Sequence, residues 1–329
     1  MNEWQEFMET QSSVLSEENF ICDASHLGLI LVTGDDAQSF LQNQLSNDIN
    51  EADESHYQLS SLSTPKGRML GIFRVVKIDT GYLLITPLGT VPALLQRLQL
   101  FVVQAQVNLA DASDYFMRIG VQTSQSQITD KIIFPRNAGE VMQSDSLISL
   151  HLGEVAGQSR YLLMTLSVDE ARSIWQSLQD SLVVASFDSW KLSEIKAGIP
   201  VIYPETAEEF VAQMANLNRI GGVNFKKGCY PGQEIVARMQ YLGKLKRRMF
   251  LAELDSKICP KPGDDLVAPN ATVADGSGKI VDAVIDSQGQ CFCLFVAQIK
   301  KAVDGNLKLL DQPSVGIKLL ELPYAVSDD

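Results

Sequence analysis

The sequence has no long apolar run. No stretch of about 18 consecutive apolar residues occurs in the 329-residue chain, which excludes a transmembrane helix. Residues 1–20 are acidic and polar, and they have neither the basic start nor the apolar centre of a secretory signal. We therefore expect a cytoplasmic protein with no membrane partner, whose residues 1–20 form a loose leader.

Residue types that bind metals or form disulfides are scarce. The chain has three histidines and five cysteines, and no Cys-x-x-Cys occurs. The histidines show no ligand spacing, so a zinc site is improbable and no metal ligand is predicted. An odd, scattered set of cysteines argues against a disulfide framework. Cys291 and Cys293 stand in an apolar run typical of a buried strand, where core packing is favoured over a metal pair.

Cations are outnumbered, with 27 Lys and Arg against 40 Asp and Glu, which argues against broad nucleic-acid binding. The segment 219–248 departs from this balance, because it holds eight cationic side chains and Glu234 alone as a carboxylate. The eight are Arg219, Lys226, Lys227, Arg238, Lys244, Lys246, Arg247 and Arg248. Such a segment favours an anionic ligand: a phosphate, a polycarboxylate or one face of an RNA. The alternative is a solvated helix face.

The most informative stretch of the chain is residues 226–234, which read Lys-Lys-Gly-Cys-Tyr-Pro-Gly-Gln-Glu. Cys229 has cationic neighbours, and Pro231-Gly232 can open a helix whose free N–H groups face the thiol. Both features favour the thiolate over the thiol. The stretch therefore predicts a reactive or ligand-binding cysteine, and the alternative is a tight turn with an incidental buried cysteine.

Apolar runs and helix caps predict an α+β chain of two or three domains. Ser167 opens a helix as part of a capping box, and Gly198 ends another helix. Strands are expected over 27–32, 57–61, 71–78 and 81–86, and helices from Asp35 or Asp36 to Leu45 and over 92–103, 167–178, 188–197 and 205–214. After residue 245, short apolar runs over 249–254, 265–268, 279–285, 291–299, 307–310 and 317–322 suggest a small β-barrel or sandwich.

Residues 227–234 resemble the K-G-C-Y-x-G-Q-E signature of the YgfZ family. Ala197-Gly198-Ile199-Pro200 resembles the family's A-G-x-P segment, and Leu322-Pro323-Tyr324 resembles its C-terminal ending. The family is related to the aminomethyltransferase, or T-protein, of the glycine cleavage system. The resemblance implies a three-domain ring: an N-terminal folate-binding α+β domain over 20–112, a middle α+β domain over 113–243 and a C-terminal β-barrel over 244–329.

The resemblance also implies a function. YgfZ proteins are described as folate-binding proteins that support tRNA modification and the maintenance of iron–sulfur enzymes. It implies Cys229 as the functional, catalytic cysteine, tetrahydrofolate or a derivative as the ligand, and iron–sulfur tRNA-modifying enzymes as partners. Trp190 matches a tryptophan linked to folate, and Leu27 stands where a second such tryptophan is found. The remaining candidates for folate contact are Lys226, Lys227, Tyr230, Arg238 and Arg248.

Two positions depart from the T-protein pattern. The carboxylate that faces the pterin in T-proteins falls at Lys196, and the turn at 66–72 reads Lys-Gly-Arg-Met-Leu-Gly-Ile without the T-protein aspartates. Because Leu or Gly cannot replace a general acid or base, aminomethyl transfer is improbable. One-carbon transfer and a folate-independent thiol-redox or metal-delivery role stay open as alternatives, and direct tRNA contact through the segment 219–248 is a further hypothesis. The Lys-Gly turns at 66–67 and 227–228 are expected to converge on one cavity.

Overall fold

The structure is a computed structural model that describes residues 3–125, 129, 132–241, 243, 245–268 and 276–326. The chain forms two units, each assembled from three separate segments. Unit 1 comprises Met1–Phe40, Asn50–Gln58 and Phe73–Ser193, and unit 2 comprises Leu41–Ile49, Leu59–Ile72 and Glu194–Asp329. The division into domains 20–112, 113–243 and 244–329 stays a prediction. Within the described ranges, no helix is long and apolar enough to cross a bilayer.

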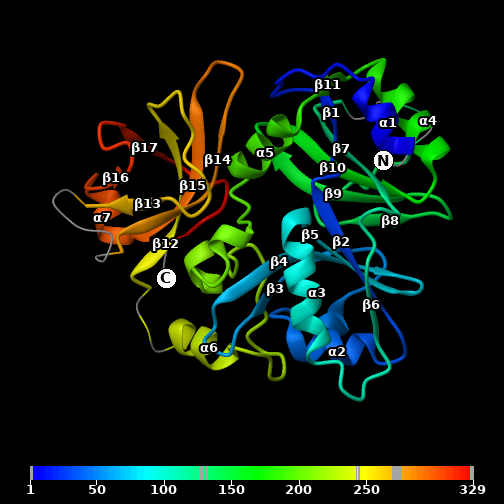
Figure 1. Cartoon of the computed structure of the whole chain (residues 1–329), viewed down its shortest axis with the longest axis horizontal. Helices are drawn as coiled ribbons and strands as arrows, with labels where there is room; N and C mark the ends of the chain where they lie inside the picture. The colour runs from blue at the N-terminus through cyan, green and yellow to red at the C-terminus, as the bar shows by residue number, and fades with distance from the viewer. Residues whose placement is uncertain are drawn as a thin grey trace. The chain divides into compact units, whose positions relative to one another are not determined.

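Unit 1 contains a six-stranded sheet with the order β11-β1-β7-β10-β9-β8 (Figure 1). β1 and β11 pair in parallel, whereas the other neighbours are antiparallel. The strands are β1 (Phe20–Asp23), β7 (Met117–Thr123), β8 (Val141–Gln143), β9 (Ile148–Val155), β10 (Gln158–Thr165) and β11 (Val183–Ala185). The helix α4 (Val168–Gln179) packs on one face, and its predicted cap is confirmed, because the Ser167 side chain accepts a hydrogen bond from the backbone N–H of Glu170.

A five-stranded sheet has the order β3-β4-β5-β2-β6. β4 runs from unit 2 into unit 1, so that β3 and the start of β4 belong to unit 2 and the other strands to unit 1. The strands are β2 (Leu27–Thr33), β3 (Gln58–Ser63), β4 (Met69–Ile78), β5 (Gly81–Pro87) and β6 (Asn108–Asp111). The predicted strands and the helix α2 (Ala37–Gln44) are confirmed, but α3 (Val91–Gln99) ends earlier than residue 103.

The two faces of the six-stranded sheet are apolar because residues alternate along its strands. In β1, Phe20 and Cys22 join a core cluster that also contains Leu29 of β2, whereas Ile21 joins the cluster beneath α4. Trp190 of the helix α5 (Phe187–Lys196) belongs to the first of these clusters. Gly120 of β7 is required there, since a Cβ on it would lie 2.5 Å from the Trp190 ring.

The loose leader expected for residues 1–20 is wrong. Glu3–Glu9 form the helix α1, which lies beside α4 in unit 1 (Figure 1). The Trp4 ring is buried against Trp175, 5.8 Å between ring centroids, and its indole N–H donates to Asp23. The sequence was misleading here because tertiary contacts, chiefly that of the buried Trp4, hold this acidic segment.

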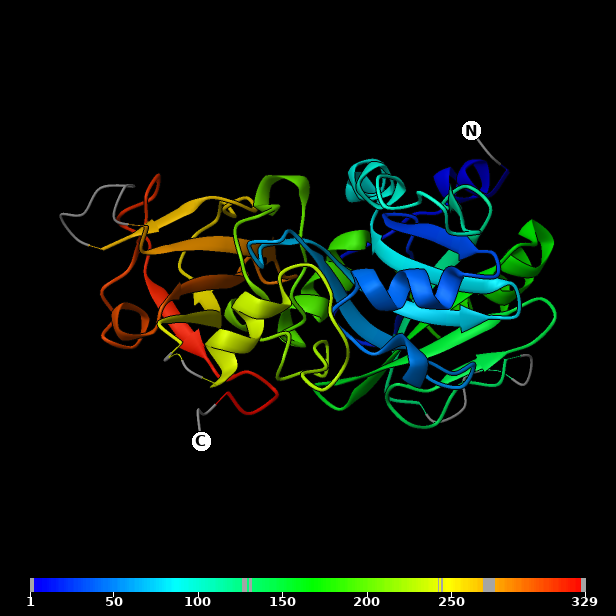
Figure 2. The same cartoon turned by 90° about the horizontal axis from the view of Figure 1, so that it is seen from below.

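Unit 2 ends in a curled, half-barrel sheet with the order β16-β13-β14-β15-β12-β17, which can be followed from yellow to red in Figures 1 and 2. Its members are β12 (Arg247–Leu254), β13 (Asp265–Val267), β14 (Gly278–Ile285), β15 (Cys291–Gln298), β16 (Lys308–Leu309) and β17 (Ile317–Leu320), with α7 (Ile299–Val303) after β15. Cys291 and Cys293 are fully buried in its core. The predicted α+β class and core packing by these two cysteines are confirmed, and the predicted C-terminal strands form this half-barrel sheet.

The segment that leads to the cysteine motif is irregular. The helix predicted over 205–214 is wrong, because two short 3-10 helices, η3 (Pro204–Thr206) and η4 (Ala212–Ala215), take its place. η4 ends at Asn216, whose left-handed backbone stops the helix. A further 3-10 turn, η1 (Ile49–Glu51), follows α2, and η2 (Leu88–Thr90) precedes α3. The helix α6 (Gln233–Tyr241) begins after Pro231-Gly232, where the sequence predicts a helix start.

Candidate functional site

Cys229 lies exposed on the turn that precedes α6 in unit 2. The other cysteines are less accessible: Cys259 is partly buried, and Cys22, Cys291 and Cys293 are buried. Burial raises the pKa of the Cys22 and Cys293 thiols well above the ordinary value. The alternative of an incidental buried cysteine is therefore wrong for Cys229. Its thiol is the one that a partner can reach most readily among the described residues.

Lys227 anchors this turn to the end of α2. Its ammonium donates hydrogen bonds to the backbone carbonyls of Gln42, Leu45 and Asn47 at 2.7, 2.7 and 2.8 Å. Only 6% of its surface is exposed. These carbonyls lie at the C-terminal end of a helix, where a cation is favourable and where backbone acceptors lack intrahelical donors. Lys227 has no donor left in this conformation for a ligand carboxylate.

Burial also affects the ionisation of the anchor. It lowers the pKa of Lys227 to about 8, although the nearby Asp48 carboxylate acts in the opposite direction. The ammonium lies 5.3 Å from the centroid of the Tyr230 ring, an added cation–π contact. Tyr230 is itself buried, which raises the pKa of its phenol to about 12. Tyr230 thus packs inside the turn, and its predicted role in folate contact stays a prediction.

Polar side chains fix the backbone on both sides of Cys229. The Asn224 side chain accepts hydrogen bonds from the backbone N–H groups of Lys226 and Lys227, at 2.8 and 3.2 Å. The Gln233 amide donates to the Lys227 carbonyl at 3.2 Å. These bonds give Lys227 and Gln233 of the motif structural tasks, so the thiol is presented from a fixed turn.

The 64–67 turn packs against Gly232 of the motif, and the convergence of the two Lys-Gly turns on one cavity stays a prediction. Gly232 has φ +84°, and a Cβ on it would lie 2.6 Å from the Thr64 carbonyl oxygen and from the Gly67 Cα. Backbone therefore packs directly on backbone, which only glycine permits. A Cβ on Gly228 would meet no heavy atom within 4 Å. The space beside Cys229 is open where the space beneath Gly232 is filled.

The predicted cationic residues separate into two groups. Lys226 and Arg238 are exposed, and neither forms an ion pair with a described carboxylate. Arg248 is half-buried, donates to the Val326 carbonyl at 3.0 Å and lies over the Phe250 ring. Arg247 donates to the Gly276 carbonyl. Lys244 lies outside the described residues. Lys226, Arg238 and Lys246 are therefore the predicted cations of this set that are exposed and form no ion pair with a described carboxylate.

Trp190 and Leu27 belong to one core cluster of unit 1. Trp190 is only 1% exposed, so it presents no ring face to a ligand in this conformation. Its indole N–H has no hydrogen-bond partner among the described residues, which is unusual for a buried polar atom. This orphaned donor is the feature of Trp190 that accords with a bound polar group. Its role in folate binding stays a prediction.

The positions that lack T-protein carboxylates have other contacts. The Lys196 ammonium lies 4.5 Å from the centroid of the Phe292 ring. At the other departure, Met69 is fully buried in β4, and its backbone N–H and carbonyl pair with Phe210 and Glu208. At both positions the residue itself is not a carboxylate, which leaves the T-protein group unreplaced in the sequence.

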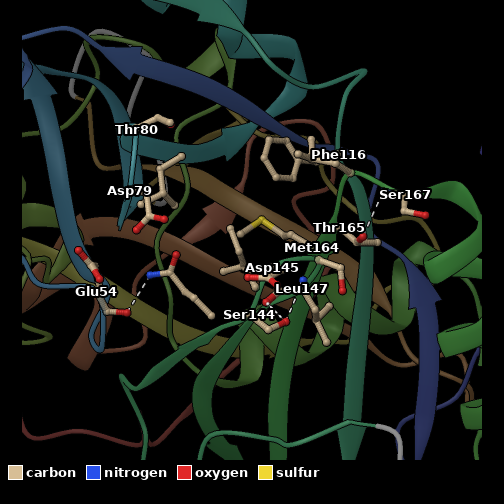
Figure 3. A pocket seen from close by; sticks show the side chains of 15 residues that line it. Glu54, Asp79, Thr80, Phe116, Ser144, Asp145, Leu147, Met164, Thr165 and Ser167 are labelled. Carbon is tan, nitrogen blue, oxygen red and sulfur yellow. Dashed lines mark hydrogen bonds between the residues drawn. The ribbon is translucent and has the colours of Figure 1, made fainter.

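A cavity of about 740 Å³ lies in unit 1 (Figure 3). Phe116 and Met164 provide apolar surface, and Glu54, Asp79 and Asp145 are its acidic residues. No lysine or arginine is among its lining residues. This pocket could not be predicted from the sequence, since its walls come from five separate segments. Its charge disfavours an anionic ligand such as a folate tail or a phosphate.

Comparisons with known proteins agree with this fold and motif. A family model described as the GCVT N-terminal domain matches residues 1–132. A "tRNA-modifying protein YgfZ" of Colwellia psychrerythraea is 31% identical over 94% of both chains. Proteins of that name from Klebsiella pneumoniae and Hamiltonella defensa are 28% and 32% identical, over 91% and 71% of this chain and 91% and 69% of theirs.

A solved structure extends the likeness to the fold of the whole chain. The crystal structure of glycine cleavage system aminomethyltransferase T from Bartonella henselae superimposes with a TM-score of 0.72. It is 14% identical, and the match covers 98% of this chain and 89% of that one. At this identity the likeness concerns the fold alone, and it leaves the reaction to be argued from the site.

Proposed function

Because the chain belongs to the YgfZ family, we propose that it is a cytoplasmic, folate-binding accessory protein that supports tRNA modification and iron–sulfur enzymes through Cys229. The observation that carries the proposal is the exposed Cys229 thiol on a turn fixed by the buried Lys227. A fold that needed only a turn would not require a cysteine there. The fixed, open position suits a thiol that must meet a second protein.

The chemistry proposed for Cys229 is transient ligation of iron. A thiolate is the form that binds iron, and a cluster takes four ligands in most proteins. One exposed sulfur therefore supplies one ligand while the partner enzyme supplies the others. The iron–sulfur species is cargo in this scheme, and the chain's own task is to hold the sulfur atom in reach.

Folate is proposed as the ligand because the fold is that of a folate-dependent aminomethyltransferase. Lys226 and Arg238 are exposed cations that suit the carboxylates of the glutamate tail by charge-assisted hydrogen bonds. Tetrahydrofolate, when bound, supplies a reduced pterin as a one-carbon carrier. The missing carboxylates at Lys196 and after Gly67 weigh against one-carbon transfer by this chain.

Complementation tests the role of the thiol. In a strain that lacks this protein, the Cys229→Ser variant should fail to restore thiolated tRNA nucleosides, measured by mass spectrometry of digested tRNA. Cys259→Ser is the matched control and should restore them, since Cys259 is partly buried in the C-terminal core. Full thiolation with Cys229→Ser would remove this cysteine from the function.

Calorimetric titration with tetrahydrofolate and its polyglutamate form tests the ligand. We expect saturable binding of both, and Arg238→Ala should weaken the polyglutamate form by about tenfold for one lost charge-assisted bond. Trp190→Phe is preferable to Trp190→Ala, because a truncated core tryptophan costs about 3–5 kcal/mol of stability.

A second candidate, a thiol-redox or metal-delivery protein without folate, is favoured by the burial of Trp190. Absence of saturable binding would select that candidate.

A further inference from the structure

We propose that the surface formed by Phe225, Lys226, Arg238 and Tyr241 beside Cys229 binds an unpaired segment of RNA directly. We call these four residues the α6 surface. The inference rests on the tRNA-modification role proposed above and names the substrate contact of the same site. It goes beyond an accessory role, in which only a partner enzyme would touch the RNA.

The α6 surface is brought together by an aromatic pair. The rings of Phe225 and Tyr241 meet edge to face, with centroids 6.2 Å apart and planes inclined at 73°. Phe225 starts the Cys229 turn and Tyr241 is the last residue of α6, so this contact joins the two ends of the motif region. Lys226 follows Phe225 directly, and Arg238 precedes Tyr241 by three residues on one helix face.

Three of the four residues of the α6 surface are open to solvent, and Phe225 is half-buried. Tyr241 is 68% exposed, and Lys226, Arg238 and Cys229 are exposed as well. An aromatic side chain that is two-thirds exposed contributes little to a core. Glu234 is the carboxylate on the same side of α6, four residues before Arg238, and the two form no ion pair. The surface therefore combines free positive charge with a ring face.

This combination matches RNA better than the other anions that a cationic site accepts. Cations that track a phosphate backbone, beside an aromatic ring on which a base stacks, are the recurring features of single-strand binding. RNA loops expose unstacked bases for such contacts. A folate tail or a bare polyphosphate uses only the cations. The acidic remainder of the chain repels phosphate elsewhere and confines RNA to this surface.

Fluorescence anisotropy with a labelled tRNA anticodon stem-loop tests the proposal on the full-length protein. We expect saturable binding that weakens as salt is added. A plot of the logarithm of the association constant against the logarithm of the salt concentration should have a slope of about −0.7 for each single-strand phosphate contact. Tyr241→Ala should weaken binding by about tenfold through lost stacking. Arg238→Ala should make the salt slope shallower by about 0.7, the change expected for one lost phosphate contact. Glu234→Gln should strengthen binding, since it removes a negative charge from the same side of α6.

Two exposed residues of unit 1 serve as matched controls. Tyr115 is 68% exposed, like Tyr241, and Arg136 is exposed, like Arg238. Tyr115→Ala and Arg136→Ala should leave RNA binding unchanged. Inorganic polyphosphate is the base-free probe: Tyr241→Ala should leave its affinity unchanged while Arg238→Ala weakens it. The proposal would be overturned if Tyr115→Ala weakened RNA binding as much as Tyr241→Ala, or if Arg136→Ala weakened it as much as Arg238→Ala. It would also be overturned if Tyr241→Ala weakened RNA and polyphosphate binding equally.

The outcome separates this inference from the function on which it rests. If RNA does not bind while Cys229→Ser abolishes tRNA thiolation in cells, RNA binding by the α6 surface is refuted and the role of the thiol stands. The cations of the surface would then be assigned to contact with an acidic protein. If RNA binds as described while Cys229→Ser has no effect in cells, the surface stands and the proposed role of the thiol fails.

Discussion

Two consecutive lysines of the Cys229 turn have opposite surroundings. Lys227 is buried and donates to three backbone carbonyls, whereas Lys226 is exposed and forms no ion pair with a described carboxylate. The first lysine therefore holds the turn, and the second is free for an anion. Assigning both to one ligand, as the charge pattern suggests, overlooks that a buried ammonium already uses all its donors.

Replacing each lysine by methionine separates these tasks. Lys227→Met should lower the free energy of unfolding by about 2–4 kcal/mol, because three carbonyls at the end of α2 lose a charged donor. Lys226→Met should change it by less than about 0.5 kcal/mol, as expected for an exposed side chain. Urea denaturation followed by circular dichroism gives both values. Equal stability of the two variants would show that the contacts of Lys227 are not structural.

The anchoring role of Lys227 could not be predicted from the sequence. Its three acceptors are backbone carbonyls at Gln42, Leu45 and Asn47, about 180 positions away, and backbone atoms carry no sequence signature. The exposure of Cys229 was predictable in kind, because polar residues, glycines and a proline surround it. The burial of Trp190 was not, since its position on α5 fits either a core face or a ligand wall.

The element that defines the site is the turn between Phe225 and α6. Its two glycines differ: Gly232 is in the left-handed region against the 64–67 turn, while Gly228 faces open space. The fold therefore requires glycine at position 232. At position 228 the absence of a side chain leaves room next to the thiol, which suits the approach of a large partner.

Alanine at each glycine tests this difference. Gly232→Ala should cost about 2 kcal/mol or more, from the left-handed backbone and the contact with Gly67. Gly228→Ala should alter stability by less than about 1 kcal/mol. Thermal unfolding of the two variants is the measurement. A larger loss for Gly228→Ala would contradict the packing of the turn described here.

Most secondary-structure elements followed from local patterns. The six short strands after residue 245 were predictable because Gly, Pro and Asp turns separate their apolar runs. The helix after Ser167 was predictable from its capping box. The leader and the 205–214 segment were not. α1 is held by tertiary contacts around the buried Trp4, and the segment before Asn216 takes a left-handed stop that periodicity does not reveal.

At the scale of the whole molecule, the site depends on a chain that enters unit 2 three times. The acceptors of Lys227 come from Leu41–Ile49, and the backbone beneath Gly232 comes from Leu59–Ile72. Cys229 itself belongs to Glu194–Asp329. Residues far apart in the sequence therefore build the surroundings of the Cys229 turn together.

A fragment of residues 194–329 should therefore fold only in part. The curled sheet has its own core and should protect its amides, whereas residues 226–234 should lose protection without their partners from the first half. Hydrogen exchange read by mass spectrometry compares the fragment with the full chain. Native protection at 226–234 in the fragment would contradict the dependence on the first half.

The most direct test is a map of native thiol reactivity. The full-length protein is treated with iodoacetamide for increasing times, and each cysteine is quantified by peptide mass spectrometry. We expect Cys229 to be modified first, Cys259 later, and Cys22, Cys291 and Cys293 only after unfolding. Protection of Cys229 to the level of Cys291, or faster modification of Cys259, would contradict a reachable thiol on a fixed turn.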